Sequence, residues 1–135
     1  MKRKILTLAL ASLTLMALCG SIYSQDDIKA LSDPAFTSMR KGAVPFKHDQ
    51  HNEKAKIADC KACHHLYKNG KLDASGDSVG TKCSECHTLT GDKNAMPLMR
   101  AYHRQCENCH AQKGAGPVTC AECHPKDAPH DALRK

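Results

Sequence analysis

The sequence has few of the large apolar side chains that normally build a hydrophobic core. It contains no tryptophan, two phenylalanines and three tyrosines in 135 residues, a length that fits one domain. Hydrophobic residues make up 41% of the chain, but many of them are cysteines or lie near the N-terminus. Burial of so few apolar groups does not offset the conformational entropy lost on folding. Either the chain is loose, or a group that is not protein supplies the core.

A basic surface for nucleic acid is also missing. The formal net charge is +6, but the lysines are dispersed and no aromatic platform accompanies them, so we expect no nucleic-acid binding. Three of the basic residues lie at positions 2–4, directly before an apolar stretch at 5–18. With an acceptable cleavage site after Ser24, this pattern predicts a secretory signal peptide at residues 1–24 and an exported protein.

Two other interpretations of the N-terminus stay open. The segment could be an uncleaved membrane anchor, although its apolar run is shorter than the roughly 20 residues that a span needs. Alternatively, Cys19 could be a lipidated N-terminus, although Leu18 precedes it where a small residue is usual. We expect no stable membrane insertion of the remaining chain.

What the sequence does contain is one short motif, repeated four times. C-x-x-C-H occurs at Cys60–His64, Cys83–His87, Cys106–His110 and Cys120–His124. The pattern is typical of covalent c-type haem attachment, in which two thiols bond to the porphyrin and the histidine coordinates its iron. Four haems would also supply the missing core. The predicted attachment residues are Cys60, Cys63, Cys83, Cys86, Cys106, Cys109, Cys120 and Cys123.

Two other uses of the same residue types are less consistent with the pattern. An exported protein with eight cysteines in pairs could be a disulfide scaffold, but that gives no reason for a histidine after every second cysteine. Structural zinc also uses cysteine and histidine, but two four-ligand sites would not require this repeat.

The remaining histidines match the number of irons that need a second ligand. Of nine histidines, four belong to the motifs: His64, His87, His110 and His124. His48, His51, His65 and His103 are the natural candidates for the opposite faces, which would make each iron bis-histidine. His130 is left over, and we expect it to be exposed.

Helix geometry limits which iron each spare histidine can reach. His64 and His65 are neighbours that would point about 100° apart on a helix, so His65 must serve a different haem from His64. His103 lies about two turns before His110 on the same helical face and cannot cross to the far side of that haem. His48 and His51 need separate irons. The second ligands therefore tie distant segments together.

The expected fold is small and mostly irregular, with a few short α-helices, one small β-hairpin and a core formed by four haems. We divide the chain into the signal at 1–24, a leader arm at 25–42 that packs on the rest, and a tetrahaem domain at 43–135. The expected elements are an edge strand or turn at 43–46, a short helix at 57–66, a turn-rich hairpin at 68–80, and the best helix at 97–111, broken by Gly114–Pro117.

Two imidazoles on each iron would leave no open position for a substrate. The iron would then cycle between Fe(III) and Fe(II), and imidazole pairs give lower potentials than a His/Met pair. We therefore expect a low-potential electron carrier and no enzyme. The alternatives are a multihaem reductase with an open haem iron and a membrane-anchored quinol-oxidising cytochrome subunit.

Over roughly residues 44–125, the sequence resembles the class III tetrahaem cytochromes of the cytochrome c3 type. The matching segments are Val44–His51, Cys60–His65 with its doubled histidine, Cys83–His87, Tyr102-His103 before Cys106–His110, and Gly116-Pro117 before Cys120–His124. In many members the second and fourth sites have four residues between the cysteines, whereas here both have two.

The resemblance implies a pairing of the ligands and a place for one aromatic residue. It places Phe46 beside the first haem. The implied pairs, each with its motif histidine first, are His64 with His48, His87 with His65, His110 with His51, and His124 with His103.

The resemblance also implies a place of action. Proteins of this type work in the periplasm of anaerobic bacteria, where they accept electrons from hydrogenase or formate dehydrogenase and pass them to membrane cytochrome complexes. They dock through lysines around the edge of the fourth haem. The basic residues close to that site in this sequence are Lys113, Lys126, Arg134 and Lys135.

Overall fold

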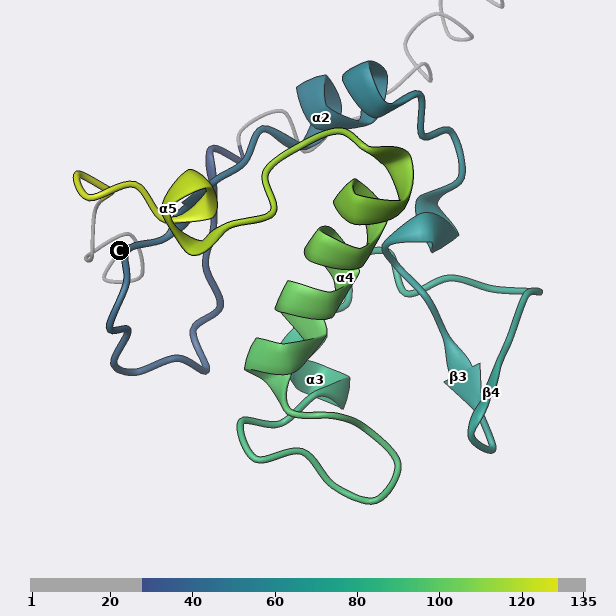
Figure 1. Ribbon diagram of the computed structural model, residues 1–135. Coiled ribbons are helices and arrows are strands. Elements are labelled where there is room, and N and C mark those ends of the chain that lie inside the picture. Colours follow the sequence, from purple (N-terminus) through teal and green to yellow (C-terminus); the bar gives the residue numbers. More distant parts are fainter. Residues whose placement is uncertain (1–27, 129–135) are drawn as a thin grey trace, which may run out of the picture.

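The computed structural model describes residues 28–128, and its longest element is the helix α4 (Leu98–Lys113). The shorter elements are arranged around this helix (Figure 1). The expected helix at 97–111 is therefore confirmed, with ends shifted by one or two residues. Pro97 precedes the first turn, and Gly114 ends the helix in the left-handed conformation with a φ of 60°. The predicted signal at 1–24, Cys19 and His130 lie outside the described residues.

The leader folds back onto the rest of the chain. Its strand β1 (Ala30–Leu31) pairs antiparallel with β2 (Val44–Pro45), the short strand expected at 43–46. Asp33, only 2% exposed, accepts a hydrogen bond of 3.3 Å from the hydroxyl of Tyr102 on α4. In residues 28–42, therefore, the leader is packed as expected.

The expected hairpin is also present. Strands β3 (Tyr67–Lys68) and β4 (Lys71–Leu72) pair antiparallel and stand out to one side of the molecule (Figure 1). Asn69 and Gly70 form the two-residue turn, with φ angles of 52° and 74°. Positive φ at both positions is the conformation for which Asn-Gly is favoured, because it matches the twist of the strands.

One predicted helix was wrong, and one helix was not predicted. At 57–66 the chain makes only a single 3₁₀ turn, η1 (Cys60–Ala62), because Asp59 caps it tightly and the chain then leaves for β3. Conversely, α2 (His48–Ala55) was not expected. Its sequence has no apolar side chain except Ala55 at its end, so the hydrophobic periodicity that predicts helices is missing.

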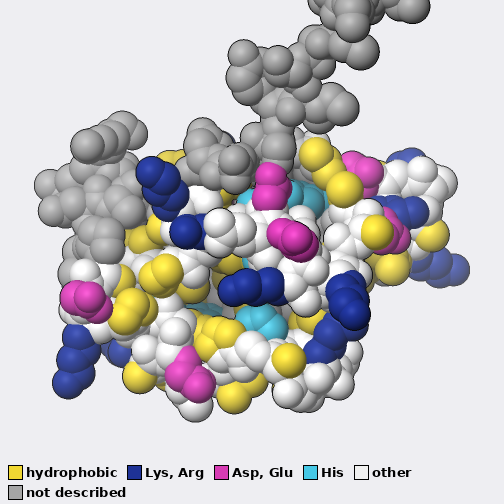
Figure 2. All heavy atoms as spheres, turned by 90° about the horizontal axis from the view of Figure 1, so that it is seen from above, with side chains coloured by type: hydrophobic (Ala, Val, Ile, Leu, Met, Phe, Trp, Pro, Cys, Tyr) yellow, Lys and Arg dark blue, Asp and Glu magenta, His cyan; other side chains and the backbone are white. Residues whose placement is uncertain are grey.

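Very little of the protein is a conventional core. Within residues 28–128, the buried apolar side chains are those of Ala43, Leu98 and Ala128. The molecule is hollowed instead, and histidine side chains are visible inside the opening (Figure 2). This arrangement agrees with the expectation that the polypeptide alone does not fill its interior.

Candidate haem sites

The C-x-x-C-H motifs share one local conformation. α3 (Cys83–Cys86), α5 (Cys120–Cys123) and η1 are single turns, and in each the backbone N–H of the motif histidine donates to the carbonyl of the first cysteine at 2.8–2.9 Å. The third motif forms part of α4. Because residues three apart lie on the same side of a helical turn, both thiols of each motif can reach one edge of a porphyrin.

A glutamate between the cysteines fixes two of these turns. Glu85 accepts a hydrogen bond from the backbone N–H of Lys82 at 2.9 Å. Glu122 accepts from the backbone N–H and the hydroxyl of Thr119 at 2.9 and 2.7 Å. The Thr119 hydroxyl and the nearby backbone N–H groups hold the pKa of Glu122 below its usual value. Both glutamates therefore cap the start of a haem-attachment turn.

The structure brings the eight candidate histidines together as four pairs of rings. In each pair one ring belongs to a motif and the other to a different segment. The ring centres are 6.4 Å apart for His48–His64, 6.1 Å for His51–His110, 6.0 Å for His65–His87 and 6.3 Å for His103–His124. These are the pairs that the resemblance implied.

These distances fit two imidazoles on opposite sides of one metal ion. A ligating imidazole nitrogen lies about 2 Å from its metal and the ring centre roughly 1 Å further, so two trans rings have centres about 6 Å apart. The angles between the ring planes range from 51° to 84°, which is compatible with such an axis because each ring can rotate about its metal–nitrogen bond. Haem iron between two histidines is the group that this geometry accommodates.

Hydrogen bonds also select the nitrogen that faces the metal. In four of the rings Nδ1 donates to a backbone carbonyl, which leaves Nε2 as the free ligand atom. The acceptors are Met96 for His87 at 2.9 Å, Met99 for His103 at 2.9 Å, Pro117 for His110 at 2.6 Å and Gly42 for His124 at 2.8 Å. His48 Nδ1 instead contacts the carboxylate of Asp49 at 2.8 Å.

A glycine makes room for one of these rings. Gly116 has a φ of 93°, and a Cβ added there would lie 2.6 Å from Cδ2 of His110 and 2.8 Å from its Nε2. The next residue, Pro117, supplies the carbonyl that holds the same ring. The Gly116-Pro117 segment therefore forms a close wall beside His110.

The ionisation of the site residues suits ligation and not nucleophilic chemistry. Burial, with His87 nearby, lowers the pKa of His65, so its ring is neutral at neutral pH, as a metal ligand must be. Burial raises the pKa of Cys63, and that of Cys106 to about 11, so neither thiol is a reactive thiolate.

Neither alternative use of cysteine and histidine finds support in the described part of the chain. All eight cysteines of residues 28–128 are free thiols. Among the same residues no group of three or more His, Cys, Asp or Glu side chains is placed to hold a metal ion, whereas a structural zinc site needs four ligands. The imidazoles lie together in pairs, which is fewer ligands than such a site needs.

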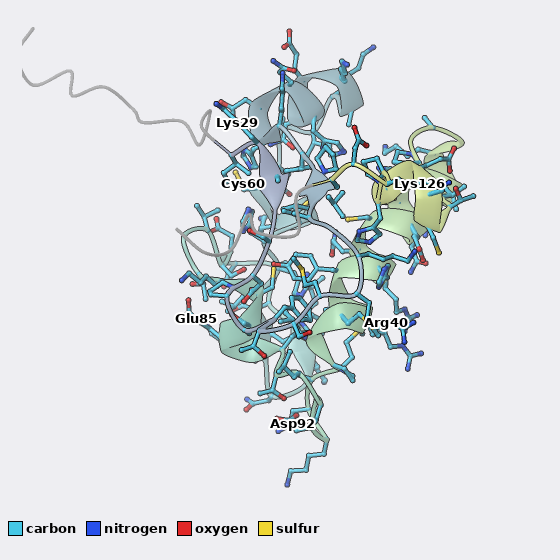
Figure 3. The ribbon with its side chains drawn as sticks, turned by 90° about the vertical axis from the view of Figure 1, so that its left-hand side faces the viewer. Lys29, Arg40, Cys60, Glu85, Asp92 and Lys126 are labelled. Atoms are coloured by element: carbon cyan, nitrogen blue, oxygen red, sulfur yellow. The ribbon has the colours of Figure 1, made fainter. Side chains whose placement is uncertain are left out.

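The resemblance also implied roles for one aromatic and several basic residues. The ring centre of Phe46 is 6.3 Å from that of His48 and 4.9 Å from that of His51, so it is closer to the histidine implied for the third haem. Lys113 and Lys126 are exposed, and Figure 3 labels Lys126 next to α5. Arg134 and Lys135 lie outside the described residues, as does the leftover His130.

Sequence reasoning missed two features of the site. Gln105 of α4 donates to the carbonyl of Ala62 at 2.7 Å and so links that helix to the first motif. The backbone acceptors of the imidazoles also have no signature, because every residue carries a carbonyl. In residues 28–128 no helix is both long and apolar enough to cross a membrane.

Comparison with known proteins identifies the family. The sequence model of the class III cytochrome c family matches residues 25–127, so the family pattern includes the leader as well as the segment from 44 to 125. Cytochrome c3 of Desulfovibrio desulfuricans is 34% identical over 100 residues, which cover 70% of this chain and 89% of that protein. Cytochrome c3 of Maridesulfovibrio salexigens is 35% identical over 107 residues, covering 71% and 91%.

A larger protein contains a similar segment. The high-molecular-weight cytochrome c of Nitratidesulfovibrio vulgaris is 35% identical over 88 residues, which are 60% of this chain and 13% of that protein. The cofactor of the chain is haem c, and its role is that of a multihaem electron carrier. On the family match and the two cytochrome c3 relatives, the chain belongs to the class III cytochrome c family.

Proposed function

We propose that the protein is an exported, low-potential tetrahaem electron carrier of the periplasm, without a catalytic site, and that its residues 1–24 are a cleaved signal. Every iron would be held by one motif histidine and one histidine from elsewhere in the chain. The proposed ligand pairs are His64 with His48, His87 with His65, His110 with His51, and His124 with His103.

The observation that carries the proposal is the set of four imidazole pairs, with ring centres 6.0–6.4 Å apart. Within residues 28–128 every histidine is a member of one pair. An iron ligated on both faces has no position for a substrate, which favours a carrier over a reductase with an open iron.

Haem c held by two imidazoles supplies a one-electron couple, and two nitrogen ligands set a lower potential than a His/Met pair. The protein contributes the arrangement of the sites. His64 and His65 are consecutive residues that belong to different pairs, so the first and second sites must be neighbours. His48 and His51 lie within one short helix and connect the first site to the third. Short distances between the sites favour electron transfer through the molecule.

The proposed partners are redox proteins. Hydrogenase or formate dehydrogenase would deliver electrons, and membrane cytochrome complexes would accept them. Exposed Lys113 and Lys126 flank the fourth motif and could contact an acidic partner. A mixing experiment with a periplasmic hydrogenase should show reduction that slows as salt screens these charges.

The haem count and ligation test the proposal directly. A pyridine haemochrome assay of the purified mature protein should give four haems per chain, and two or fewer would contradict it. Each of four single alanine variants should convert one low-spin haem to high-spin: those at His48, His51, His65 and His103. His130→Ala is the matched control and should leave all four low-spin. If the four variants also kept four low-spin haems, the proposed ligation would be wrong.

The N-terminus separates the exported carrier from a membrane-anchored quinol-oxidising subunit. Mass spectrometry of the native protein should find a chain that starts at Gln25. A retained N-terminal segment, or a lipid on Cys19, would favour anchorage.

A further inference from the structure

One of the paired imidazoles contacts a carboxylate. Nδ1 of His48 is 2.8 Å from the carboxylate oxygen Oδ1 of Asp49, the next residue of α2. In four other paired rings, those of His87, His103, His110 and His124, Nδ1 donates to a neutral backbone carbonyl. In the His48–His64 pair, a carboxylate therefore takes the place that a neutral carbonyl has in those four rings.

We propose that Asp49 is a positioning and tuning residue that lowers the reduction potential of the haem held between His48 and His64. This inference rests on the proposed function, because it requires His48 to be an iron ligand. Beyond that function, it names the haem site whose potential the protein lowers and the residue that lowers it.

The physical reason is the charge on the acceptor. A carboxylate that accepts the Nδ1 proton of a metal-bound imidazole fixes the ring orientation and makes Nε2 a stronger donor. Charge-assisted hydrogen bonds of this kind are about twice as strong as those to neutral carbonyls. A stronger donor and a nearby negative charge both stabilise Fe(III) relative to Fe(II). Reduction adds one electron at the iron, makes or breaks no bond and leaves the proton on Nδ1.

The side chains of His48 and Asp49 are 26% and 38% exposed, so the charge is partly screened by water. For a unit charge about 7 Å from the iron in such a site, Coulomb's law gives an effect of the order of tenfold on a one-electron equilibrium. At a fixed ambient potential, Asp49→Asn should therefore raise the Fe(II):Fe(III) ratio of this haem about tenfold, equivalent to about 59 mV.

The experiment is a redox titration of the four-haem protein in which NMR signals of the individual haems are followed. Glu53→Gln is the matched control, because it removes the same charge from an exposed position in α2 that no imidazole contacts. We expect Asp49→Asn to raise the potential of one haem by about 59 mV and the other three by much less. We expect Glu53→Gln to have a small effect on all four.

Two results would overturn the inference while leaving the proposed function intact. One is an unchanged potential in a four-haem, fully low-spin Asp49→Asn protein, and the other is an equal shift in Glu53→Gln. If His48→Ala left its haem low-spin, the proposed ligation would fail and the inference with it.

A second measurement needs no variant and decides the matter if Asp49→Asn does not assemble. In the fully reduced wild-type protein, the Nδ1 proton of His48 should resonate downfield of those of His87, His103, His110 and His124, because its acceptor is charged. A resonance within the range of those four would overturn the inference.

Discussion

Replacement of Gly116 by alanine tests whether the wall beside His110 holds that ring in place. A Cβ at this position would lie 2.6 Å from Cδ2 and 2.8 Å from Cγ of His110. Ordinary carbon–carbon contacts are about 3.5–4.0 Å, so the ring would have to retreat by about 1 Å. Such a movement would break the 2.6 Å hydrogen bond from Nδ1 to the carbonyl of Pro117 and move the ring relative to its partner His51, the other proposed ligand of the same iron.

The expected loss has two parts. Gly116 has a φ of 93°, and a left-handed conformation costs an alanine about 1–2 kcal/mol. Loss of the Nδ1 hydrogen bond adds about 1 kcal/mol. The free energy of unfolding should therefore fall by about 2–3 kcal/mol in Gly116→Ala.

Gly114→Ala is the matched control, because it isolates the backbone part. Gly114 also has a positive φ, 60°, but a Cβ there meets no atom within 4 Å. We expect it to cost about 1–2 kcal/mol and to leave the haem spectra unchanged.

Guanidinium unfolding followed by the Soret band gives both free energies, and the oxidised spectra report the ligation. Gly116→Ala should lose about 1 kcal/mol more than Gly114→Ala and show a high-spin fraction from one haem. Equal losses with four intact low-spin haems would refute the argument from the close contact.

Three further predictions concern stability. Tyr102→Phe leaves the buried carboxylate of Asp33 with one hydrogen-bond donor fewer, so the free energy of unfolding should fall by about 1–3 kcal/mol while the haem spectra stay unchanged. An unchanged free energy of unfolding would contradict the packing of the leader. The lowered pKa of Glu122 means that its stabilisation is present above the unfolded pKa of about 4.3 and is lost as pH falls through the lower folded value. Glu122→Gln should therefore lower Tm at pH 7 but not below the folded pKa, and an equal difference at both pH values would count against the cap. A haem-free chain with reduced cysteines should show no cooperative thermal transition by circular dichroism, because the polypeptide has almost no core of its own; a sharp transition would disprove this.

Local chemistry explains what could be predicted about the fold. Asn69-Gly70 predicts the hairpin because both residues accept a positive φ, and Pro97 with Gly114 bounds the long helix because neither suits a helix interior. Helix α2 was missed for the opposite reason. Its inner face carries His48 and His51 and not aliphatic residues, so its sequence lacks a hydrophobic stripe.

By itself the sequence predicted the cofactor chemistry and a stoichiometry of four haems, because covalent haem attachment needs only five consecutive residues and four such motifs occur. The number of spare histidines followed as well. The spacing of the histidines along the sequence did not decide which imidazole rings pair, and only the resemblance to a family implied a pairing. The tertiary structure decided that question, because residues such as His51 and His110 meet only when the chain returns to itself. It also decided that Asp49 lies on an imidazole and that Gly116 lies against one, since both depend on distances between side chains that no local pattern fixes.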